Sequence, residues 1–137
     1  MEAEKKNETY TKLKILVLTI KKSNLADDER DLVENIYQQV LKLENVENKE
    51  KRHKQITKIL KLVNNFFDQI KAKLAYIQNQ LNQVHSPEEY QHLREEFARI
   101  FRLTMKLERI IQTLSELAEL NNFVETSNLE DEKGATL

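Results

Sequence analysis

Apolar residues recur at every third or fourth position through most of residues 49–122, with one interruption at His85-Ser86-Pro87. The stripe before the interruption comprises Ile56, Ile59, Val63, Phe66, Ile70, Leu74, Ile77, Leu81 and Val84. The stripe after it comprises Tyr90, Leu93, Phe97, Ile100, Thr104, Leu107, Ile111, Leu114 and Ala118. A mean step of about 3.5 residues is the spacing of a coiled-coil seam. The pattern therefore predicts two long helices, at about 49–84 and 87–122.

The interruption itself carries a helix-start signal. Ser86 suits the N-cap, Pro87 suits the first helical position, and Glu89 completes a capping box. A turn this short makes the two helices antiparallel neighbours. Folding the chain about residue 85 or 86 places Phe97 near Leu74, so the two stripes face each other.

The first third of the chain predicts two shorter helices, at about 9–22 and 25–46, separated by a turn at Ser23-Asn24. A strand over residues 12–20 is rejected because nothing else in the chain could pair with it. The chain's one glycine is Gly134, and sheets with tight turns normally need glycine. We therefore expect an all-α, elongated three- to four-helix bundle built on the long antiparallel hairpin, with coiled-coil-like packing.

The expected organisation is a flexible N-terminus at 1–8, one helical bundle domain at 9–124, and a disordered acidic tail at 125–137. The chain has no cysteine, a net charge of −1, and no apolar run near the ~20 residues that span a bilayer. These features argue against disulfides, a thiolate metal site and a membrane partner. The apolar run at residues 15–20 is too short for a signal-peptide core, lysines follow it directly, and no small-residue cleavage site appears, so we expect a cytoplasmic location. Without glycine in the helical region, no phosphate-cradling loop is available.

Two Glu-x-x-His motifs, Glu50 to His53 and Glu89 to His92, invite a metal-site hypothesis, since di-iron bundles use such pairs. Both motifs fall at helix starts, so an antiparallel hairpin separates them by roughly 50 Å at 1.5 Å per residue. A metal site would therefore need an antiparallel dimer that joins the two ends. We expect no metal, no cofactor, no small-molecule substrate and no enzymatic activity.

A second apolar stripe with seven-residue spacing on the last helix raises a different possibility. We expect partner-binding residues at Leu103, Ile110, Leu117 and Val124, with Leu62 and Tyr76 on the other long helix. Phe101 and Met105 also lie outside the main seam. A wide apolar face packs against two neighbours. The second neighbour is either the pair of short helices or another protein chain. The leading hypothesis is a protein-interaction or assembly scaffold, forming a homodimer through this stripe.

The alternative hypothesis is a nucleic-acid-associated accessory protein, because cations cluster along the two long helices. The candidate phosphate-binding residues are Lys51, Arg52, Lys54, Lys58, Arg102 and Arg109. The simpler interpretation is that these are solvated outer-face charges interleaved with acidic residues. Glu96, at the margin of the last helix's stripe, is expected to form an ion pair with Lys71 or Lys73 across the hairpin.

Overall fold

The computed structural model describes the backbone of residues 2–136 and the side chains of residues 4–121. Within this part the chain is all-α, with no strand, as the apolar periodicity predicted. The helices are α1 (Glu2–Lys21), α2 (Asp27–Lys42), α3 (Lys49–Leu81) and α4 (Pro87–Thr136), with a single 3-10 turn, η1 (Leu43–Asn45), after α2.

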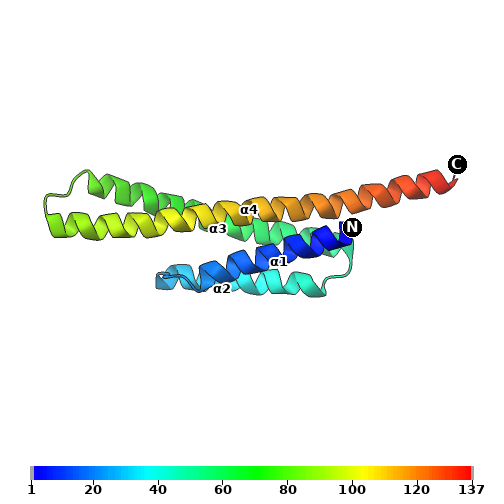
Figure 1. The fold of residues 1–137 in the computed structure, drawn as a ribbon, viewed down its shortest axis with the longest axis horizontal. Coiled ribbons are helices and arrows are strands. Elements are labelled where there is room, and N and C mark those ends of the chain that lie inside the picture. The colour runs from blue at the N-terminus through cyan, green and yellow to red at the C-terminus, as the bar shows by residue number, and fades with distance from the viewer. Residues whose placement is uncertain (1, 137) are drawn as a thin grey trace.

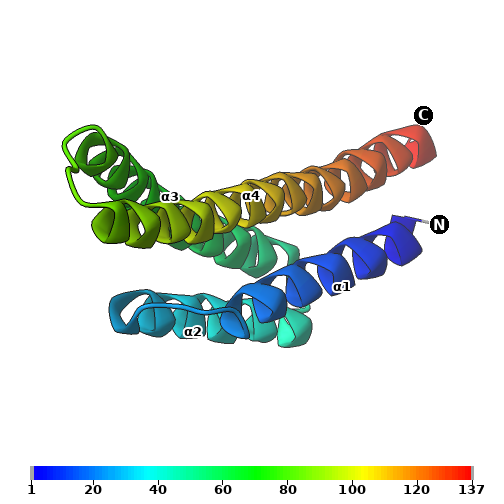
Figure 2. The ribbon, with the colours of Figure 1, turned by 60° about the vertical axis from the view of Figure 1, so that its left-hand side comes forward.

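The four helices run alternately up and down, and each packs against its neighbours in a ring. α3 lies along α4, α1 lies along α4, and the short hairpin of α1 and α2 closes the ring against α3. Figures 1 and 2 show an elongated molecule in which the tip of the α3–α4 hairpin projects beyond the α1–α2 turn. The tip is therefore a two-helix structure, whereas the middle of the molecule has four helices.

Local capping explains where the long helices begin. The Asn48 side chain accepts hydrogen bonds from the backbone N–H groups of Glu50 and Lys51 at 2.9 and 3.2 Å, which starts α3. The Ser86 hydroxyl accepts from the Glu89 N–H at 3.4 Å, at the predicted start of α4. Both predicted starts of the long hairpin are thus confirmed.

Other boundaries differ from the predicted ones. α1 begins at Glu2, earlier than the predicted start near residue 9, and α2 gives way to η1 after Lys42. The backbone of α4 continues as a helix to Thr136, so the predicted end near residue 122 is wrong. The side chains of the acidic segment 125–137 lie outside the described part. The division into a bundle domain and a disordered tail stays a prediction.

The core is one continuous cluster to which all four helices contribute. Its largest fully buried side chains include Leu13 and Ile20 of α1, Phe66 of α3, and Leu107 and Ile110 of α4. A residual cavity at their centre measures only about 10 Å³, so the helices interdigitate closely. The amide of Asn121 donates to the Lys49 carbonyl at 3.5 Å, in agreement with the predicted hairpin register.

Candidate functional site

The second apolar stripe of α4 is not a free surface. Leu103, Ile110 and Leu117 are only 4%, 1% and 3% exposed, because α1 packs along this side of α4. Of the two alternatives left open by the sequence, the intramolecular one is correct for these three residues. α1 of the same chain already covers these side chains, so their exposure does not support their assignment as partner-binding residues.

The remaining predicted partner residues fall into three different cases. The Val124 side chain lies outside the described residues. Leu62 is half-buried against the core of its own chain. Tyr76, on the projecting part of α3, is 65% exposed and is the member of the predicted set most open to a partner.

The predicted cationic residues are distributed over separate parts of the surface. Lys51, Lys54 and Lys58 are exposed along the first half of α3, and Arg52 donates to the Glu47 carbonyl at 2.7 Å. Arg102, by contrast, lines a small pocket beside the turn between α1 and α2. Arg109 is exposed on α4. The nucleic-acid hypothesis stays a prediction.

A buried carboxylate lies where three helices meet. Glu29, in the first turn of α2, is 1% exposed. Its two oxygens accept from Arg99 of α4 at 2.7 and 3.3 Å and from Lys73 of α3 at 2.8 Å. The backbone N–H of Ala26 also donates to it, at 3.0 Å. This cluster joins the start of α2 to the last third of α3 and the first third of α4.

The charges around Glu29 determine its ionisation. Burial by itself would raise the pKa of Glu29, but the hydrogen bonds from Arg99 and Lys73 outweigh it and lower the pKa from 4.5 to about 2. Asp28, beside it, accepts from Lys73 at 2.8 Å. A carboxylate held ionised and fully hydrogen-bonded cannot act as a general acid or base near neutral pH. We interpret the cluster as structural.

The ion pair predicted for Glu96 is wrong in its partner. Glu96 pairs with Arg99, one turn along the same helix, at 2.6 Å, while Lys73 pairs with the two acidic residues of α2. No role was predicted for Glu29, because its partners Lys73 and Arg99 are 44 and 70 residues away in the sequence. Glu29 fills a gap in the buried face of α2 between Leu25 and Val33, and this position was the available signal.

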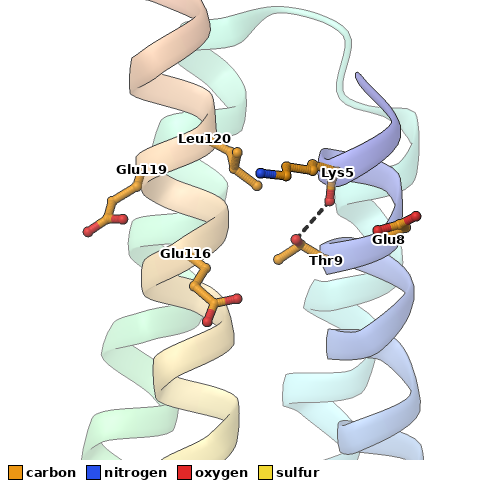
Figure 3. A pocket seen from close by; sticks show the side chains of 6 residues that line it. All are labelled: Lys5, Glu8, Thr9, Glu116, Glu119 and Leu120. Carbon is orange, nitrogen blue, oxygen red and sulfur yellow. Dashed lines mark hydrogen bonds between the residues drawn. The ribbon is translucent and has the colours of Figure 1, made fainter. Parts of the chain in front are cut away.

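A groove of about 580 Å³ opens between the start of α1 and the far part of α4 (Figure 3). Lys5 and Leu120 point into the gap between the helices, whereas Glu8 and Glu119 point away from it. The Thr9 hydroxyl donates to the Lys5 carbonyl at 2.7 Å. The polar groups therefore do not converge on one point, as they would in a site built for a small molecule.

The outer face of the α3–α4 hairpin keeps a row of large apolar side chains exposed. Tyr90, Phe101 and Met105 of α4 are 46%, 47% and 50% exposed, and Phe97 is half-buried between them. The rings of Phe97 and Phe101 are stacked, with centroids 6.1 Å apart. A shallow groove of about 450 Å³ runs beside this row, between Phe67 of α3 and Ile111, Glu108 and Gln112 of α4.

The two Glu-x-x-His motifs lie at the starts of α3 and α4, at opposite ends of the antiparallel hairpin. Among the described side chains, no group of three or more histidine, aspartate or glutamate residues has the geometry to hold a metal ion. In the same part of the chain, no helix combines the length and apolar character needed to cross a bilayer.

Comparison with protein-family models, curated proteins and solved structures found no match to this chain.

Proposed function

We propose that this chain is a non-enzymatic helical assembly module that self-associates through the outer face of its long hairpin. The mechanism is burial of the exposed apolar row on α4, together with the half-buried side chains of α3 beside it. A cytoplasmic location is part of the same proposal.

The observation that carries this proposal is the exposure of Tyr90, Phe101 and Met105 on one helix. α1 already covers the opposite side of α4, where Leu103 and Ile110 are buried. Scattered exposed apolar residues are normal, but several along one helix face commonly mark an interaction site. The interaction surface proposed here is thus a different stripe from the one expected from the sequence.

Charge supports self-association over a strongly charged partner. The chain has 22 cationic and 23 acidic residues, a net charge of −1, so two copies repel each other only weakly. Helix faces with apolar residues at intervals of three and four are the usual means by which helices associate.

Sedimentation velocity over a dilution series tests the proposal. We expect the weight-average mass to rise with concentration from the 16.3 kDa of one chain toward twice that value. Phe101→Glu should shift the protein to the monomer without unfolding it, because the side chain is half exposed. The matched control is Ile15→Glu on α1, which is 58% exposed and lies off the proposed surface. A monomeric mass at every concentration would rule out self-association.

A further inference from the structure

Five residues on the outer face of α4 are placed symmetrically about Phe101. Phe97 and Met105 lie four residues before and after it, and Arg94 and Glu108 lie seven residues before and after it. Steps of four and seven residues keep side chains on one face of a helix. From either end, the row therefore has its apolar residues at the same spacing. It carries a cation at one end and a carboxylate at the other.

This symmetry matters for an antiparallel pairing of α4 with the α4 of another copy. A two-fold axis at Phe101 would place each Phe101 against the partner's Phe101 and each Phe97 against the partner's Met105. It would also place Arg94 against the partner's Glu108, once on each side of the axis. The charge pattern is thus complementary to itself in this one register.

The charged ends of the row are available for such pairs. Arg94 and Glu108 are exposed, and neither forms an ion pair or side-chain hydrogen bond within the described part of the chain. Their neighbours differ in this respect, since Glu95 accepts from Gln91 at 3.2 Å and Arg99 is held by Glu29 and Glu96. A pairing through Arg94 and Glu108 would therefore break no existing contact.

We infer that the occupant of this face is a second copy of the same chain, bound through an antiparallel α4–α4 contact centred on Phe101. This inference rests on the proposed function and adds the surface, the symmetry and the register. The groove beside the row, lined by Phe67 and Ile111, borders Glu108 and extends the contact toward α3. Two hairpins joined in this way form a four-helix arrangement, a common solution for antiparallel helices.

Charge exchange tests the register directly. Arg94→Glu brings two carboxylates together at both symmetric contacts, and Glu108→Arg brings two cations together. Exposed ion pairs are weak, but each change acts twice, so we expect each single variant to weaken dimerisation about tenfold. The double variant restores opposite charges and should return to within about threefold of the wild-type dissociation constant. Failure of the double variant to recover over both single variants would overturn the inference.

Cross-linking provides a second readout, since the chain has no cysteine of its own. Phe101→Cys places two thiols at the two-fold axis, where mild oxidation should join the copies. Ile15→Cys is the control, because Ile15 is at least as exposed as Phe101, at 58% against 47%, but lies on α1. Equal cross-linking of the two variants would contradict the register.

The failure of this inference and the failure of the proposed function are distinguishable. A wild-type protein that dimerises, while charge exchange shows no recovery, retains the assembly function and refutes the α4–α4 register. A wild-type protein that is monomeric at all concentrations refutes both.

Discussion

Glu29 offers a sharp test of what holds the bundle together. The change Glu29→Gln keeps the size of the side chain and an oxygen to accept the Ala26 N–H, but it removes the negative charge. Arg99 and Lys73 then lose the carboxylate that lies 2.7–3.3 Å from them. The expected result is a less stable protein with the same fold.

The magnitude follows from the pKa of Glu29. A pKa lowered from 4.5 to about 2 corresponds to about 3 kcal/mol of stabilisation at neutral pH. Arg99 keeps Glu96 and Lys73 keeps Asp28, so neither cation is left without a partner. We therefore expect Glu29→Gln to lower the free energy of unfolding by about 2–3 kcal/mol, which is below the usual cost of leaving a buried charge unpaired.

The pH dependence distinguishes this explanation from a loss of packing. Because the pKa of Glu29 is lower in the folded chain than in the unfolded chain, its contribution is complete above about pH 4.5 and is lost as the pH falls toward 2. The difference in stability between wild type and variant should thus fall to roughly half its neutral value near pH 3. Urea denaturation followed by circular dichroism at both pH values measures it.

Glu34→Gln is the matched control, because Glu34 is a half-exposed carboxylate on the same helix, paired with Lys21 at 3.0 Å. It should have little effect at either pH, as expected for a surface ion pair. A Glu29→Gln variant as stable as wild type at neutral pH would refute the reasoning. A destabilisation that is as large near pH 3 as at neutral pH would also refute the reasoning.

Two further predictions concern the core and the caps. Ile110→Ala should lower the free energy of unfolding by about 2–4 kcal/mol, because it opens a cavity in a closely packed core. Ile15→Ala, on the exposed face of α1, should have little effect in the same urea titration. Asn48→Ala should lower the free energy of unfolding by about 1 kcal/mol, because the α3 cap is lost. Ser86→Ala should lower it by less, because the Ser86 hydrogen bond is longer, at 3.4 Å. Thermal melts of the two variants side by side would show this order, and the reverse order would contradict the prediction.

Much of the fold was predictable because it depends on local interactions. The stripe from Ile56 to Val84, the Ser86-Pro87 start signal and the near absence of glycine predicted the antiparallel hairpin. Helix ends were less predictable. The backbone of α4 passes through Asn121 without a break, and this polar side chain is buried, bonded to Lys6 and to the carbonyl of Lys49.

The candidate surface was only partly predictable. The sequence showed that α4 has more apolar positions than one partner helix can bury, and it identified both Leu103 and Phe101 as members of that excess. It did not show which of them the short helices would cover. The periodicity marks a face as apolar but does not identify the neighbour that packs on it.

What the sequence by itself determined was the set of helices and the hairpin register, because caps and apolar spacing act between residues close in the chain. Tertiary structure alone decided which face of α4 is covered and which stays exposed. It also decided that Glu29 is buried, since its partners Lys73 and Arg99 are 44 and 70 residues away. These outcomes depend on how three or four helices meet in space, and a pattern read along one helix does not contain that information.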